Sequence, residues 1–122
     1  MTSNRLVVLI VEDEPLLRLY ASDTFEDMGY DVIEAENADE ALLILETRDD
    51  IAFLFTDIDM PGSMDGLKLA HAVSHRWPPI CVIVTSGLAN QRKIVMPERG
   101  HFVGKPYGPA QIETALRSFR GA

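Results

Sequence analysis

Three short runs of the sequence are apolar at every position, and each ends at polar or charged residues. They span residues 6–11 (LVVLIV), 51–55 (IAFLF) and 80–84 (ICVIV). Each run is too short for a typical helix and is rich in β-formers, which predicts strands buried on both faces. A chain with several such strands must place a covering layer on each side of its sheet. This requirement favours an α/β fold over an all-β or all-α fold.

The segments between these runs carry helical patterns. Pro15, Asn37 with Glu40, and Pro109 are typical of helix starts, whereas Gly29 and Pro78 are typical of helix ends. The predicted buried faces are Leu17, Ala21, Thr24 and Met28; Ala38, Ala41, Leu42 and Leu45; Leu67, Ala70, Val73 and Trp77; and Ile112, Ala115, Leu116 and Phe119. Two shorter strands are expected at residues 30–35 and 100–104.

Strands and helices that alternate in this way predict a five-stranded, doubly wound parallel sheet with helices on both faces. The segment 88–99 (LANQRKIVMPER) fits this pattern least well. A helix is expected between two parallel strands, but Pro97 and the poor apolar spacing predict a short or irregular fourth helix. With 122 residues, the chain is expected to form one domain, residues 1–122, without an output domain.

Composition excludes several classes of function. The net charge of −8 argues against direct binding to nucleic acid, because the phosphate backbone attracts clustered Lys and Arg. Cys81 is the only cysteine, so neither a disulfide framework nor a cysteine-based zinc site is expected. No apolar run is long enough to cross a bilayer. The interpretation is a cytoplasmic protein that does not bind membranes.

In a parallel sheet, the C-terminal ends of all strands lie along one edge. That edge is expected to gather Glu12, Asp13, Asp57, Thr85 and Lys105 from four separate strands. Ligands of open α/β sheets bind there, so a carboxylate at this position belongs to a site more often than to a core. Taken alone, however, Asp57 is equally compatible with opening the turn that contains Pro61 and Gly62.

These residues and motifs resemble the receiver domain of two-component response regulators, over essentially the whole chain. The resemblance is carried by VEDEP at Glu12 and Asp13, FTDIDMPGSMDG at Asp57, VIVTSG at Thr85 and FVGKPY at Lys105. One such motif would be weak evidence for the family. Four motifs in the right order, each at a strand end, are specific evidence. The resemblance implies the flavodoxin-like strand order 2-1-3-4-5. It also implies that Asp57 accepts a phosphoryl group.

The same resemblance assigns roles to the site residues. Clustered carboxylates with a phosphoryl substrate call for a hard cation, so Mg²⁺ is expected, with Mn²⁺ as a possible replacement. Its expected ligands are Glu12, Asp13, Asp57 and the backbone carbonyl of Asp59. Lys105 is expected to neutralise charge on the phosphoryl oxygens, and Thr85 to bind one of them after transfer, with Ser86 a lesser candidate. Phe102 matches the family's switch aromatic, although a permanently packed strand residue is an equal possibility.

As a receiver, the chain would take its phosphoryl group from a histidine kinase or a histidine phosphotransfer protein. It would act on an unknown downstream protein and could form a homodimer. It would be a signalling domain, catalysing only its own phosphorylation and dephosphorylation.

Two alternatives stay open. The LFTDIDMPG segment also resembles the nucleophile motif of haloacid-dehalogenase-type phosphatases, although Met60 stands where that motif has Thr or Val. The chain could also be an interaction module with a vestigial site. His71 and His75, one helical turn apart, have no third ligand in view and are interpreted as surface residues.

Overall fold

The computed structural model of the protein describes residues 5–62, 64–87 and 94–120. In this part of the chain, five parallel strands form one sheet in the order β2-β1-β3-β4-β5. The strands are β1 (Val7–Val11), β2 (Asp31–Ala35), β3 (Ile51–Asp57), β4 (Cys81–Ser86) and β5 (Gly100–Gly104). Both the doubly wound parallel sheet and its predicted strand order are confirmed.

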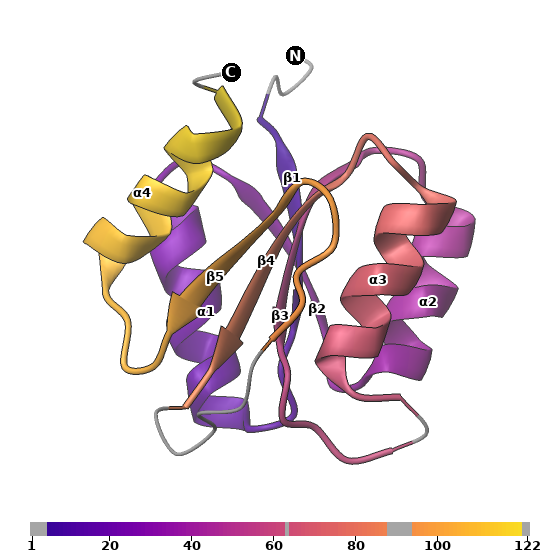
Figure 1. The fold of residues 1–122 in the computed structure, drawn as a ribbon. Helices are drawn as coiled ribbons and strands as arrows, with labels where there is room; N and C mark the ends of the chain where they lie inside the picture. The colour runs from indigo at the N-terminus through magenta and orange to yellow at the C-terminus, as the bar shows by residue number, and fades with distance from the viewer. Residues whose placement is uncertain (1–4, 63, 88–93, 121–122) are drawn as a thin grey trace.

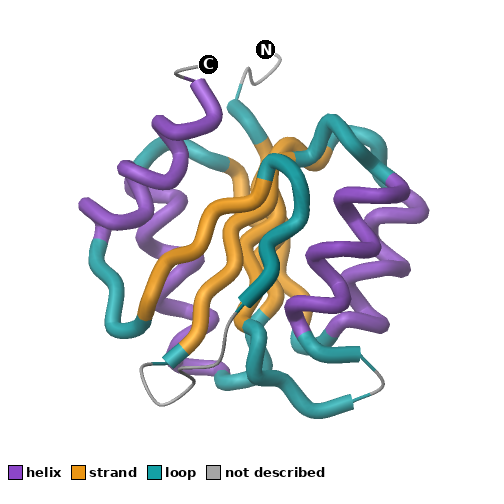
Figure 2. Tube along the Cα trace, in the orientation of Figure 1, coloured by secondary structure: helices purple, strands orange, loops and turns teal. Residues whose placement is uncertain are grey.

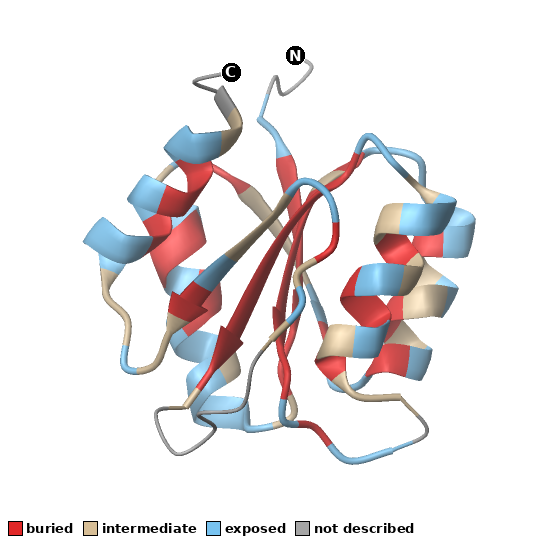
Figure 3. Ribbon diagram, viewed as in Figure 1, coloured by how far each residue is buried: buried red, intermediate tan, exposed pale blue. Residues whose placement is uncertain are grey.

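Four helices in the described residues cover the two faces of the sheet (Figures 1 and 2). Helices α1 (Pro15–Asp27) and α4 (Pro109–Arg120) lie on one face, and α2 (Ala38–Thr47) and α3 (Gly66–Arg76) on the other. Strands β1, β3 and β4 are buried over nearly their whole length, as continuous apolar runs require (Figure 3). Alternate residues of each central strand therefore contribute to two separate cores.

The helix ends follow the signals in the sequence. The side chain of Asn37 accepts a hydrogen bond from the backbone N–H of Glu40 at 2.8 Å, as a capping box requires. The Glu40 carboxylate in turn accepts a hydrogen bond from the backbone N–H of Glu36. In a standard capping box the donor would be the N–H of the next residue, Asn37. Gly29 follows α1 with a φ of +96°, a conformation that glycine adopts without steric cost. Helix α3 ends at Arg76, before the two prolines.

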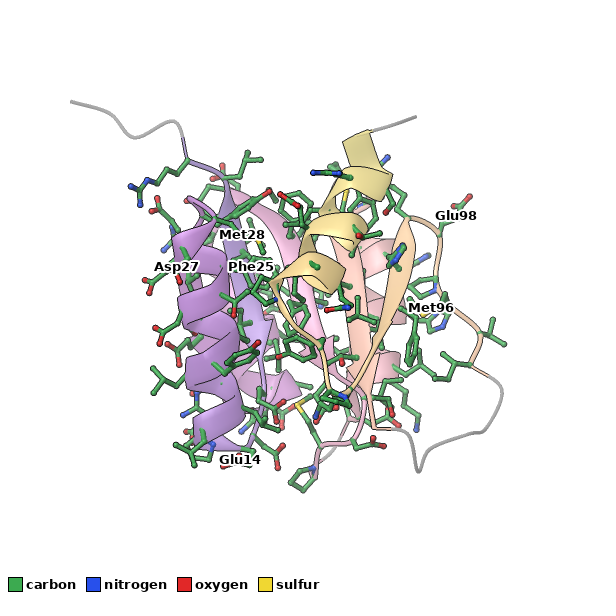
Figure 4. All side chains as sticks on the ribbon, turned by 90° about the vertical axis from the view of Figure 1, so that its left-hand side faces the viewer. Glu14, Phe25, Asp27, Met28, Met96 and Glu98 are labelled. Carbon is green, nitrogen blue, oxygen red and sulfur yellow. The ribbon has the colours of Figure 1, made fainter. Side chains whose placement is uncertain are left out.

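The predicted buried face of α1 is partly wrong. Ala21 and Thr24 are buried as expected, but Leu17 is exposed and Phe25 is the large side chain that fills the core. In Figure 4, Phe25 lies near the upper end of α1, close to Asp27 and Met28. The inner stripe of the helix contains Arg18 at its N-terminal end, where an apolar residue was expected. The predicted faces of the other three helices all pack against the cores.

The connection between β4 and β5 departs from a regular βαβ unit. Residues 88–93 of the predicted irregular segment lie outside the described residues, and residues 94–99 form no helix. Ile94 and Met96 pack against the core shared with α2 and α3. The His71 ring lies 2.7 Å from the carbonyl oxygen of Val95, and Ser74 donates to the carbonyl of Glu98 at 3.1 Å. This connector, on which Figure 4 labels Met96 and Glu98, is therefore attached to α3.

Three residues that the sequence leaves outside the candidate site have ordinary surroundings. Cys81 is buried at the start of β4 and its sulfur accepts a hydrogen bond from Arg99. His71 and His75 are exposed on α3. Within the described residues, no helix is both long and apolar enough to span a membrane.

Candidate phosphoacceptor site

The predicted site residues meet at the C-terminal edge of the sheet, the lower edge in Figure 1. Glu12 and Asp13 follow β1, Asp57 ends β3, Thr85 lies in β4, and Lys105 follows β5. One oxygen from each carboxylate of Glu12, Asp13 and Asp57 lies within 4.8 Å of the other two. Strand pairing produces this arrangement, because parallel strands with nearly equal lengths bring their ends to the same edge.

Lys105 lies among these acids. Its Nζ atom is 3.1 Å from Oδ2 of Asp57 and 3.5 Å from Oε1 of Glu12. Burial disfavours the charged ammonium, but the negative charges of Asp57 and Glu12 outweigh that effect and raise the pKa of Lys105. The lysine therefore stays protonated and provides a fixed positive charge beside the Asp57 carboxylate.

Glu12 is the most strongly perturbed acid of the site. Burial is the main cause that raises its pKa to about 7, and the nearby Asp57 charge adds to the effect. The backbone of Glu12 is fixed by its N–H, which donates to the carbonyl of Ala35 in β2. Its Oε2 atom accepts from the N–H of Glu14 at 3.1 Å. The backbone of Glu12 is therefore held by β2, and its carboxylate is held by the N–H of Glu14.

Asp57 is buried at the end of the central strand, with only 3% of its surface exposed. Burial raises the pKa of this carboxyl, while Lys105 and the N–H of Asp59 oppose the shift. That N–H lies 3.3 Å from Oδ1 of Asp57. A carboxylate with one oxygen on a lysine and the other on a backbone donor has a defined orientation, as an attacking group needs.

Thr85 is the neighbour of Asp57 across the β3–β4 pairing. Its hydroxyl oxygen is fully buried and has no hydrogen-bond partner within the described part of the chain. Buried hydroxyls are normally paired, so an unpaired one at a strand end indicates a missing partner. The next residue, Ser86, instead donates to Oδ2 of Asp59 at 2.9 Å.

Phe102 is not part of this cluster. It lies in the edge strand β5, opposite Val84, and 41% of its surface is exposed. The structure therefore places the ring in an outward position, and it is not a permanently packed core residue.

Gly66 is a site residue that the sequence analysis missed. A Cβ atom at this position would lie 1.7 Å from the backbone oxygen of Asp57 and 2.8 Å from the Thr56 hydroxyl. The first residue of α3 can therefore approach the end of β3 only because it has no side chain. Its position just after the proline and glycine loop is the one sequence signal that could have indicated a close backbone approach.

The chemistry of the site suits a hard divalent cation. Its ligand atoms are carboxylate oxygens, two of the three acids are buried, and Asp13 is the more accessible. Oxygen ligands with open positions are typical of Mg²⁺, which keeps several waters and binds substrate phosphates. The residues present therefore fit a magnesium site.

Comparison with known proteins agrees with the fold and with this site. The sequence model of the response regulator receiver domain matches residues 8–117. The chain belongs to this family and is a receiver domain of the two-component response regulator type.

Two relatives illustrate the range of proteins that contain such a domain. The nitrogen assimilation regulatory protein NtrX of Azorhizobium caulinodans is 32% identical over 121 residues, which cover 93% of this chain but only 26% of NtrX. A chemotaxis protein CheY homologue of Campylobacter jejuni is 30% identical, over 93% of this chain and 92% of that protein. The match therefore spans nearly a whole protein in one case and one part of a longer protein in the other.

Solved structures show the same fold. A response regulator receiver protein from Sinorhizobium medicae superposes with a TM-score of 0.85 at 24% identity, over 98% of this chain and 97% of that one. The receiver domain of the hybrid histidine kinase CckA has a TM-score of 0.74 at 26% identity, over 92% and 96% of the two chains.

Proposed function

We propose that this receiver domain is phosphorylated on Asp57 in a Mg²⁺-dependent reaction, and that the phosphoryl group switches a surface for protein partners. The observation that supports the proposal most directly is the convergence of Glu12, Asp13 and Asp57 within 4.8 Å, with the Lys105 ammonium 3.1 Å from Asp57. A nucleophilic carboxylate, an oxygen-rich cation site and a fixed positive charge are what phosphoryl transfer to aspartate requires.

The residues expected to bind Mg²⁺ are Glu12, Asp13, Asp57 and, through its backbone carbonyl, Asp59. When bound, the cation neutralises charge on the phosphoryl oxygens and on the acids around them. Mn²⁺ prefers the same oxygen ligands and could replace it. In the absence of the cation, Lys105 is the group that balances the charge of Glu12 and Asp57.

In the proposed reaction, an Asp57 carboxylate oxygen forms a bond to phosphorus while the bond between phosphorus and the donor breaks. With a phosphohistidine donor, the imidazole nitrogen keeps the electron pair and takes up a proton. The Lys105 ammonium is placed to hold a phosphoryl oxygen, because it already lies against the oxygen atom of the acceptor. Dephosphorylation would be the attack of water on the same phosphorus.

Thr85 is the proposed sensor of the new group. Its buried hydroxyl lacks a partner within the described residues, and a phosphoryl oxygen on the adjacent Asp57 would supply one. Movement of Thr85 would open space near β5, where the exposed Phe102 could turn inward and change the surface of β5 and α4. A histidine kinase or phosphotransfer protein would donate the phosphoryl group, and a downstream protein would bind the changed surface.

The test is the intact mass of the protein after incubation with acetyl phosphate, with Mg²⁺ or with EDTA. We expect one phosphoryl adduct that requires Mg²⁺, is labile in base, and is lost in Asp57→Asn. The matched control is Asp23→Asn, which removes the same charge from an exposed position on α1 and should retain the adduct. No adduct on the wild-type protein, or an adduct retained in Asp57→Asn, would contradict the proposal.

A further inference from the structure

Arg18 connects the acidic end of β1 to two neighbouring elements. It lies on α1 one turn after Glu14, the residue labelled at the lower end of that helix in Figure 4. Its Nη1 atom donates to the backbone carbonyl of Glu12 at 2.8 Å, and its Nε atom donates to the Glu34 carboxylate of β2 at 3.0 Å. Only 16% of the side chain is exposed, which is low for an arginine outside a core.

These contacts complete the fixation of Glu12. The backbone N–H of this residue is bound to β2, its carboxylate is bound to the N–H of Glu14, and its carbonyl receives the guanidinium. Glu12 and Asp13 lie beyond the last residue of β1, where the regular strand pairing has ended. The planar guanidinium, with two donors, therefore adds a second attachment to β2 beside the hydrogen bond from the Glu12 N–H to Ala35.

We propose that Arg18 is a positioning residue for the cation site: by fixing the backbone at Glu12, it holds the carboxylates of Glu12 and Asp13 toward Asp57 before Mg²⁺ binds. The inference rests on the proposed function, in which these acids bind Mg²⁺. Groups that orient metal ligands without touching the metal commonly change metal affinity about 10- to 100-fold when they are removed.

Electrostatics and positioning make opposite predictions here. Removing a positive charge near a cation site should by itself strengthen Mg²⁺ binding, because like charges repel. Losing the fixation of Glu12 should weaken it, because the ligands must then be ordered when the cation binds. The direction of the change therefore separates a positioning role from a purely electrostatic one.

The experiment is calorimetric titration of the full chain with MgCl₂ alone. We expect Arg18→Met to weaken Mg²⁺ affinity about tenfold. Arg18→Lys should weaken it too, because lysine keeps the charge but loses the fork. Glu34→Ala, which frees only the outer end of the guanidinium, should have a smaller effect in the same direction. The matched control is Arg48→Met, which removes the same charge from an exposed pair with Asp50 and should leave the affinity unchanged.

The inference is overturned if the folded Arg18→Met and Arg18→Lys variants bind Mg²⁺ as tightly as the wild type, or more tightly. If Arg18→Met does not fold, Arg18→Lys decides in the same way, because it keeps the charge and loses only the fork. Acetyl phosphate labelling of the wild type is scored separately. A labelled wild type with unchanged variant affinities removes only the role of Arg18, whereas an unlabelled wild type with weakened variants removes only the proposed function.

Discussion

At the scale of single residues, Gly66 leaves no room for a side chain. Gly66→Ala would bring a Cβ atom to 1.7 Å from the Asp57 backbone oxygen, so either α3 or the end of β3 must move. We expect a loss of roughly 3 kcal/mol in the free energy of unfolding, the upper part of the usual range for overpacking. Urea denaturation measures this. Gly87→Ala is the control, because none of the described residues comes within 4 Å of a Cβ there, and equal losses in the two variants would contradict the explanation.

Lys105 should matter for phosphorylation and not for cation binding. In Lys105→Met, the ammonium beside Asp57 and Glu12 is lost, so Mg²⁺ affinity should be unchanged or higher. The rate of phosphorylation by acetyl phosphate should fall by roughly 100-fold, as for the loss of one stabilising donor. Time courses of intact mass measure the rate, with the exposed Lys68→Met as the charge-matched control. Weaker Mg²⁺ binding in Lys105→Met would show that the role is wrong.

The perturbed Glu12 makes metal-free stability depend on pH. Burial raises its pKa from the ordinary 4.5 to about 7, so the folded protein holds this proton more tightly than the unfolded chain. The resulting stabilisation is complete below about pH 4.5 and is lost as the pH rises through 7. In EDTA, the contribution of Glu12 should therefore lower the unfolding temperature as the pH rises from 5 to 8, and Asp57, whose pKa is also raised, acts in the same direction.

Cation binding should reverse this trend, because the ligands must be deprotonated before they bind Mg²⁺. The increase in unfolding temperature on adding MgCl₂ should be larger at pH 8 than at pH 6. Thermal scans at both values, with Glu12→Gln as the control, test the assignment. An equal dependence on pH in Glu12→Gln would show that another group is responsible.

At the scale of elements, α2 depends on its N-terminal cap. The Asn37 side chain satisfies the N–H of Glu40, which would otherwise lack a partner at the start of the helix. Asn37→Ala should lower the free energy of unfolding by about 1 kcal/mol, measured in urea. Asn37→Asp keeps an acceptor at the cap and should lie within a few tenths of the wild type. Similar losses in both variants would assign the effect to something other than the cap.

The helix α1 shows where sequence patterns fail at this scale. Leu16, Leu17, Leu19 and Tyr20 offer more apolar residues than one buried stripe can use, so periodicity alone does not determine which face turns inward. The side that does turn inward begins with Arg18, whose hydrogen bonds to Glu12 and Glu34 replace apolar contacts. Leu17 was therefore predicted to be buried and Phe25 was missed. Pairings between distant residues decide such a register, and they are not visible in a local pattern.

At the scale of the whole molecule, the strands and their common edge could be predicted because fully apolar runs have few alternatives in a small domain. The meeting of Glu12, Asp13, Asp57, Thr85 and Lys105 at that edge followed from the same reasoning, since each stands at or just after the end of a strand. The roles proposed for them came from the resemblance to receiver domains. Gly66 and Arg18 could not be found in this way. Their roles arise from the approach of α3 to β3 and of α1 to β2, contacts that appear only once the elements are packed.

The proposed function depends above all on Asp57 as the residue that carries the phosphoryl group. The most direct measurement is to treat the protein with acetyl phosphate and Mg²⁺, reduce it with borohydride, and digest it with trypsin. Reduction converts an aspartyl phosphate into homoserine, and the tryptic peptide between Arg48 and Lys68 contains both Asp57 and Asp59. We expect homoserine at position 57 alone. Homoserine at position 13 or 59, or at none, would contradict it.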